Sequence, residues 1–165
     1  MTPGQQQWVL EVAGEAAEAK HVFPRMAACE AALESTYGGS ALARMAYNLF
    51  GTKQHVHPTY GTLNLPTKEF LGGEWVVQNA EWVKYESFAE CFADRMATLE
   101  RLKGEYPHYA AALAAPGPVS YINEVSKSWS TDPSRALKVI AIYNEVFPVT
   151  NSDNSQAVGQ VVAEG

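Results

Sequence analysis

A single glutamate stands near the end of an alanine-rich stretch, in AALESTYGGSALA at residues 31–43. The stretch is typical of a helix that Gly38-Gly39 ends, so Glu34 would lie in the last helical turn. The helix C-terminus and the apolar neighbours of Glu34 both favour a protonated carboxyl group. Such an acid can donate a proton to a leaving oxygen, as cleavage of a glycosidic bond requires. The plainer interpretation is a solvated glutamate at a helix end.

Two further carboxylates could share this chemistry. Glu30 lies four residues before Glu34, on the same helical face, where two like charges would favour protonation of one of them. Glu69 lies in TKEFLGG, on a strand whose next turn is a glycine pair. Thr67 and Glu69 would share one face of that strand, so Glu69 can point into a cleft. Taken alone, both glutamates are also ordinary surface residues.

Aromatic residues could supply surfaces for stacking on sugar rings, although such residues are more often part of a core. The candidates are Tyr37, Tyr47, Phe50, Trp75, Trp82 and Trp129. Other chemistries lack their motifs, since no serine stands in a nucleophile elbow and no glycine loop could hold a phosphate. His55 and His57 have no third ligand at a recognisable spacing, so we expect no metal and no cofactor.

The elements that would position these residues follow from periodicity and from helix and turn signals. Helices are predicted over residues 5–20, 24–35, 40–46, 87–103, 107–115 and 118–128, and a last one after Thr131-Asp132-Pro133. That last helix would carry Leu137, Ile140, Tyr143 and Phe147. A hairpin is predicted from TLNLPTKEF, Gly72-Gly73 and EWVVQNAEWVKY, with Pro66 on an edge strand or at a bulge. The fold class is therefore α+β, predominantly α, with a helical lobe and a small hairpin lobe flanking a cleft.

Composition excludes several classes of protein. The chain has 165 residues, 47% of them hydrophobic and 18% charged, which is typical of one globular domain. We place that domain at 1–148 and a polar tail, disordered or a linker, at 149–165. A net charge of −6 without a basic stripe argues against nucleic acid. No apolar run is long enough to span a bilayer, and no secretory signal peptide is visible. Cys29 and Cys91 are expected to be buried free thiols.

Five stretches in the same order resemble the bacterial peptidoglycan N-acetylglucosaminidases of glycoside hydrolase family 73. FPRMAACEAALESTYGGSALA resembles PS-x-x-x-AQAALES-G-W-G-x-S-x-LA, and YNLFGTK resembles NLFG-x-K. TKEFLGG resembles T-x-E-x-x-x-G, WVKYES resembles F-R-x-Y-x-S, and WSTDPSRALKV resembles YATDP-x-Y-A-x-K. The resemblance spans about residues 8–147 and implies a lysozyme-like fold.

The resemblance also implies roles for individual residues. Glu34 takes the place of the general acid and Glu69 that of the second catalytic carboxylate, while Asn48 and Phe50 match the stretch that lines the cleft floor. Tyr37 and Trp129 stand where the pattern has Trp and Tyr, and we expect both to bind substrate. Glu30 stands where the pattern has Gln.

The function that follows is hydrolysis of the β-1,4 bond after N-acetylglucosamine in peptidoglycan. Glu69 would activate water or stabilise the transition state, and attack by the substrate's own acetamido group is a third route. Alternatives are a muramidase or lytic transglycosylase on the same fold, or an inert glycan-binding module. We expect a monomer made in the cytoplasm that acts at the cell wall or periplasm, by a delivery route the sequence leaves open. An immunity or delivery protein is a possible partner for such an enzyme.

Overall fold

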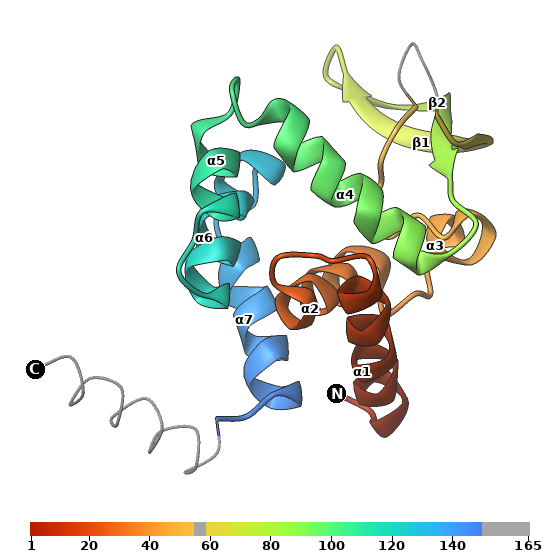
Figure 1. Cartoon of the computed structure of the whole chain (residues 1–165). Coiled ribbons are helices and arrows are strands. Elements are labelled where there is room, and N and C mark those ends of the chain that lie inside the picture. Colours follow the sequence, from red (N-terminus) through yellow and green to blue (C-terminus); the bar gives the residue numbers. More distant parts are fainter. Residues whose placement is uncertain (55–58, 150–165) are drawn as a thin grey trace, which may run out of the picture.

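The computed structural model describes residues 1–54 and 59–149, and it confirms the expected fold class: a mainly helical body carries one two-stranded antiparallel sheet (Figure 1). His55, His57 and the tail from residue 150 lie outside the described residues. The helices are α1 (Pro3–Glu18), α2 (Pro24–Ser35), α3 (Ala41–Ala46), α4 (Phe88–Leu102), α5 (Pro107–Leu113), α6 (Pro118–Trp129) and α7 (Arg135–Val146), and the strands are β1 (Gly61–Leu71) and β2 (Glu74–Lys84).

Helix starts follow the signals in the sequence. Proline occupies the first turn of α1, α2, α5 and α6, where its missing N–H costs no hydrogen bond. The hydroxyl of Thr2 caps α1 in a reciprocal capping box with Gln5. The hydroxyls of Ser40 and Ser87 cap α3 and α4 by accepting hydrogen bonds from the backbone N–H groups of Ala43 and Glu90.

Helix α2 is the centre of the helical body, packed against α1, α6 and α7. Eight of its twelve residues are buried, which its many alanines permit because they let neighbouring helices approach closely. The helix ends at Ser35, and Thr36 and Tyr37 both adopt the left-handed conformation. Gly38 follows at φ 76°, with the indole of Trp8 so close that a Cβ there would lie 2.7 Å from it. Glu34 therefore sits where a buried helix emerges at the surface.

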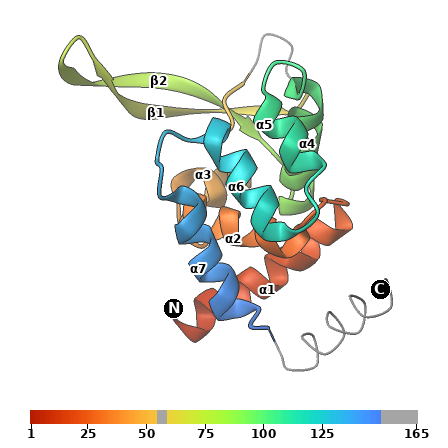
Figure 2. The same ribbon diagram turned by 90° about the vertical axis from the view of Figure 1, so that its left-hand side faces the viewer.

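The hairpin extends away from the helices (Figure 2). Its strands pair in continuous register, with Phe70 opposite Trp75 on either side of the turn. Gly72 and Gly73 have φ values of 59° and 85°, the positive pair that a two-residue hairpin turn requires. Pro66 pairs with Asn79 in a sheet that has only edge strands, so the edge prediction is confirmed and no bulge forms.

Helix α7 differs from the sequence-based expectation in the face that it buries. Leu137, one of the apolar residues that this helix was predicted to carry, is 71% exposed. The buried positions are Arg135, Val139 and Val146, and a residue two places after Arg135 points to the opposite side of a helix. The helix is thus turned so that an arginine, not a leucine, enters the interior.

Candidate active site

Glu34 forms an ion pair with the first residue of α7. Its Oε1 accepts a hydrogen bond from Nε of Arg135 at 2.8 Å. The Glu34 side chain is 29% exposed and the Arg135 side chain 2%. One partner of the pair therefore faces solvent and the other is part of the interior.

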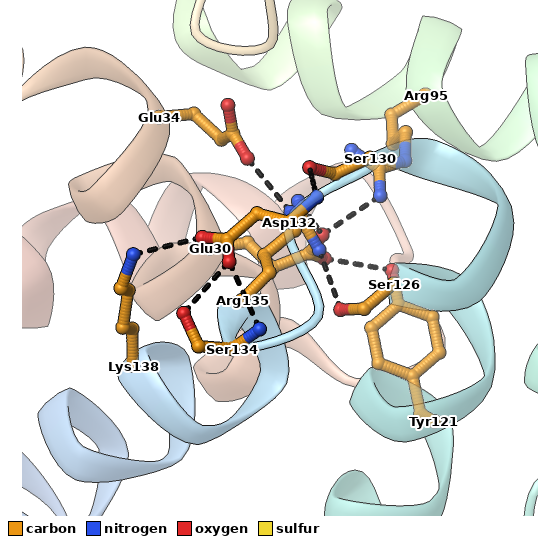
Figure 3. Close-up of polar contacts among 10 residues, drawn as sticks. All are labelled: Glu30, Glu34, Arg95, Tyr121, Ser126, Ser130, Asp132, Ser134, Arg135 and Lys138. Carbon is orange, nitrogen blue, oxygen red and sulfur yellow. Dashed lines mark hydrogen bonds and ion pairs between the residues drawn. The ribbon is translucent and has the colours of Figure 1, made fainter.

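Arg135 is held from three sides (Figure 3). Besides the Nε contact to Glu34, Nη1 donates to the hydroxyl of Ser126 at 2.8 Å, and Nη2 donates to Oε2 of Glu30 at 2.7 Å. The planar guanidinium presents its donors in a fixed fork, so three bonds in three directions set its orientation. Burial would lower the pKa of Arg135, but Glu30 and Glu34 outweigh burial and raise it. Arg135 is a permanent positive charge under Glu34.

Glu30 is the anion at the base of the site. Its side chain is wholly buried and accepts bonds from Arg135, from Nη2 of Arg95 at 2.8 Å and from the hydroxyl of Tyr121 at 2.9 Å. Burial alone would raise the pKa of Glu30, but the two arginines outweigh it and lower the pKa to about 2. The sequence suggested that like charges on this face would favour protonation. At Glu30 the opposite holds, because two cations that the pattern did not reveal surround it.

Arg95 lies between two aromatic rings. Its guanidinium carbon is 3.6 Å from the ring centroid of Trp129 and 4.3 Å from that of Phe50. Its Nε and Nη1 are buried and have no hydrogen-bond partner in the structure. The faces of the two rings stand in for the missing hydrogen-bond acceptors, since a desolvated cation is attracted to the negative face of an aromatic system.

His21 and Tyr121 extend the network on the inner side. Nδ1 of His21 accepts from the backbone N–H of Phe23 at 3.1 Å, so its proton sits on Nε2, 3.4 Å from the Tyr121 hydroxyl. That hydroxyl donates to Glu30. Burial lowers the pKa of His21 to about 4, with Glu30 opposing and Arg95 assisting the shift. The imidazole is therefore neutral at neutral pH, and Arg95 and Arg135 are the cations that hold Glu30 in its charged form.

The loop between α6 and α7 brings Arg135 into position. Oδ1 of Asp132 accepts from both the backbone N–H and the hydroxyl of Ser134, which folds the chain tightly before the helix begins. Lys138 donates to Oδ2 at 2.8 Å, and this bond, followed by those from Ser134, lowers the pKa of Asp132. The Asp-Pro signal at the start of α7 thus serves to place a buried arginine. A hollow of about 990 Å³ beside this loop is lined by residues that include Ser126 and Asp132 but not Glu34.

The residues expected to bind substrate differ in how open they are. Asn48 is buried, and its side chain is used by backbone groups: Nδ2 donates to the carbonyls of Thr52 and Val83, both at 2.9 Å, and Oδ1 accepts from Thr52. Phe50 is only 6% exposed. Both side chains are thus buried in the substrate-free protein, and their expected contact with substrate stays a prediction. Asn48 ties its loop to β2, and Phe50 supports Arg95.

Tyr37 and Trp129 keep part of their rings accessible. Tyr37 packs edge-on against Trp8, with 6.3 Å between ring centroids, and Trp129 packs against Arg95 and Phe50. Both therefore have a structural contact on one side and a half-exposed side chain. Their expected contact with substrate stays a prediction.

Glu69 lies on the hairpin, near its tip. Its carboxylate pairs with Lys53 at 2.9 Å, and the two side chains are 34% and 50% exposed. Lys53 also lies over the ring of Trp82, at 5.4 Å from the centroid. Within the described residues, the polar contact of the Glu69 side chain is the one with Lys53, and Glu69 does not contact Glu34. Its catalytic role also stays a prediction.

Sequence reasoning missed the two buried arginines. A signal existed for Arg95, which lies on the apolar stripe of its helix between Phe92 and Leu99, both fully buried. An arginine on such a stripe has to find a partner inside the protein. The predicted free thiols, in contrast, are confirmed: Cys29 and Cys91 are buried and unpaired.

Comparison with known proteins matches residues 10–147 to the family model described as glucosaminidase, mannosyl-glycoprotein endo-beta-N-acetylglucosaminidase. The chain belongs to this family. A probable N-acetylmuramidase of Lactococcus lactis subsp. cremoris is 30% identical over 150 residues, which are 87% of this chain and 33% of that protein. The exo-glucosaminidase LytG of Bacillus subtilis is 30% identical over 172 residues, covering 90% of this chain and 56% of LytG.

The fold of this glucosaminidase-family domain agrees with a solved relative. The catalytic domain of the autolysin Auto from Listeria monocytogenes superimposes with a TM-score of 0.75 at 25% identity, covering 88% of this chain and 86% of that one. The chain spans about a third of the length of the first curated relatives that it matches. Within the described part of the chain, no helix has the length and apolar character to cross a bilayer.

Proposed function

We propose that this domain hydrolyses peptidoglycan, cleaving the β-1,4 bond after N-acetylglucosamine, with Glu34 as the general acid. The observation that carries the proposal is the position of Glu34: a partly exposed carboxyl group at the end of a buried helix, held by a buried arginine. The family match supports cleavage after N-acetylglucosamine, since its model is described as a mannosyl-glycoprotein endo-beta-N-acetylglucosaminidase. The names of relatives include an autolysin and an exo-glucosaminidase.

In the proposed reaction, the proton of the Glu34 carboxyl moves to the glycosidic oxygen while the bond from that oxygen to C1 breaks. Water adds to C1 and completes hydrolysis. Glu69 on β1 is the proposed second carboxylate, which activates this water or stabilises the positive charge that develops at C1. The hairpin would have to bring Glu69 to the bound glycan, and its pair with Lys53 would then open.

The test compares two variants with matched controls on purified cell wall. Glu34→Gln should abolish release of soluble fragments, and Glu69→Gln should reduce it strongly. Glu18→Gln is the control for the first, because Glu18 is an exposed glutamate at the end of α1, and Glu81→Gln is the control for the second, because Glu81 is exposed on β2. Full activity in Glu34→Gln would contradict the proposed mechanism.

The bond that is cleaved needs a separate measurement, because the relatives' names include both a muramidase and a glucosaminidase. Mass spectrometry of the products should find N-acetylglucosamine at the reducing ends. Reducing N-acetylmuramic acid would indicate a muramidase, and an anhydro ring would indicate a lytic transglycosylase. Binding of glycan without any product would indicate an inert module.

The proposed place of action is the bacterial cell wall, where the substrate lies. The domain would work there as a monomer, without a metal or cofactor, and a delivery or immunity partner would control its access to the wall. Size-exclusion chromatography with light scattering tests the monomer, and co-purification with neighbouring gene products tests the partner.

A further inference from the structure

The ion pair of Glu34 is part of a balanced group of four buried or half-buried charges. Glu30 and Glu34 carry the negative charges, and Arg95 and Arg135 carry the positive ones. Glu30 contacts both arginines but can neutralise only one of them. The carboxylate of Glu34 supplies the second negative charge, so the group is neutral only while Glu34 is ionised.

We propose that Arg135 is a positioning residue that holds Glu34 as an oriented carboxylate in the substrate-free protein, and that bound glycan must release Glu34 from Arg135 before proton donation. This inference rests on the proposed function, in which Glu34 is the general acid. It adds a step to the reaction and assigns a role to Arg135, whose side chain need not touch the substrate.

The two partners differ in their freedom to move. Arg135 is fixed by Ser126 and Glu30, and its side chain is 2% exposed. Moving the Arg135 side chain would disrupt the buried ion pairs around Glu30 and Arg95. An uncompensated charge in the interior is costly. Within the described residues, the Glu34 carboxylate is held by Arg135 alone, and the Glu34 side chain is 29% exposed. Release therefore means rotation of Glu34 toward the side that solvent or substrate occupies.

The proton balance explains why release matters. The paired carboxylate has no proton to give, so Glu34 takes one from solvent as it leaves the guanidinium. That proton then passes to the glycosidic oxygen, which also takes the electron pair of its bond to C1. Glu34 is again a carboxylate and can return to Arg135. The pair would thus restore the resting state after each cleavage.

Other charged groups around the pair are already matched. Glu30 on α2 faces Arg95 from α4, and Asp132 in the loop before α7 is paired with Lys138. Tyr121 of α6 and His21 before α2 are both neutral, because burial raises the pKa of the phenol and lowers that of the imidazole to about 4. Among residues 1–54 and 59–149, Arg135 is the charged side chain in contact with Glu34.

The experiment measures pH–rate profiles on purified peptidoglycan for the unaltered chain, Arg135→Gln and Arg135→Lys. The basic limb of such a profile reports loss of the acid's proton. Arg135→Gln should move this limb to higher pH, because it removes the positive charge that lies 2.8 Å from the Glu34 carboxylate. Arg135→Lys keeps the charge, so its limb should stay in place while kcat falls, because an ammonium cannot reproduce the three-way fork. An unmoved limb in Arg135→Gln overturns the inference.

A second measurement does not depend on how the variants fold. In a crystal of the unaltered chain with a β-1,4-linked N-acetylglucosamine oligomer, Oε1 of Glu34 should have left Nε of Arg135, from 2.8 Å to beyond hydrogen-bond reach. An unchanged contact with sugar in place contradicts the inference. Failure of the proposed function gives a different result: the unaltered chain neither binds the oligomer nor releases products from cell wall.

Discussion

Removing the charge of Glu30 should destabilise the protein more than most single substitutions do. Glu30→Gln keeps the size of the side chain and an oxygen for the Tyr121 hydroxyl, but it leaves two buried arginines with only Glu34 as a counter-charge. Arg95 is affected most, because its remaining nitrogens face aromatic rings and not acceptors. The substitution therefore creates an unpaired charge in the interior.

The size of the effect follows from burial. Breaking a buried ion pair by removing one partner costs about 3–5 kcal/mol. The lowered pKa of Glu30, from 4.5 to about 2, corresponds to roughly 3 kcal/mol. For a domain of this length, such a loss lowers Tm by about 6–20 °C. Because the folded-state pKa lies below the unfolded one, this contribution is present above about pH 4.5 and disappears as the pH falls toward 2.

Urea unfolding at neutral pH, followed by tryptophan fluorescence, gives the free energy of unfolding for the comparison. Glu69→Gln is the control, because it removes one partner of an ion pair of similar length, 2.9 Å, whose side chains are half exposed. That pair should contribute about 1 kcal/mol or less. A loss below about 1 kcal/mol for Glu30→Gln as well would refute the view that the buried arginines depend on Glu30.

Three further changes test neighbouring parts of the site. His21→Asn keeps an acceptor for the N–H of Phe23 but removes a group whose pKa is lowered from 6.5 to about 4. In the unaltered chain, this group lowers the free energy of unfolding by about 3 kcal/mol as the pH falls from 6.5 to 4, and the variant should lack this decrease. Asn48→Ala should cost about 2 kcal/mol or more, measured by urea unfolding, because buried backbone groups lose their partners. Trp129→Leu should cost about 2 kcal/mol through Arg95, whereas an equal stability in thermal melts would show that the ring does not support that cation.

Local signals were sufficient for most of the fold. The bounds of α2 and the caps at Ser40 and Ser87 follow from chemistry within a few residues, and so does the turn at Gly72-Gly73. The face of α7 that is buried could not be predicted in this way. Hydrophobicity alone would place Leu137 in the interior and Arg135 at the surface, whereas the structure has the reverse. What turned the helix is a set of partners contributed by α2 and α6.

The candidate site could be predicted only in part for the same reason. Glu34 was found because its place at a helix end and its surrounding motif are local. The partners of Glu30 are 65, 91 and 105 residues away along the chain, so no spacing rule connects them. Asn48 was assigned to substrate from its motif, whereas the structure shows an amide used entirely by the backbone. A motif identifies a residue's neighbourhood but not the direction of its side chain.

Two differences from the motifs that this sequence resembles lie in contact with each other. By that resemblance, Glu30 stands where AQAALES has Gln, and Arg135 stands where YATDP-x-Y has its second Tyr. Each change alone would bury a charge, but together they form an ion pair of 2.7 Å. Because Arg135 also forms an ion pair with Glu34, these two charged residues affect the partly exposed carboxylate as well as the interior. It places a permanent cation beside the proposed acid, so if Glu34 is the general acid, it has to leave that cation in every turnover.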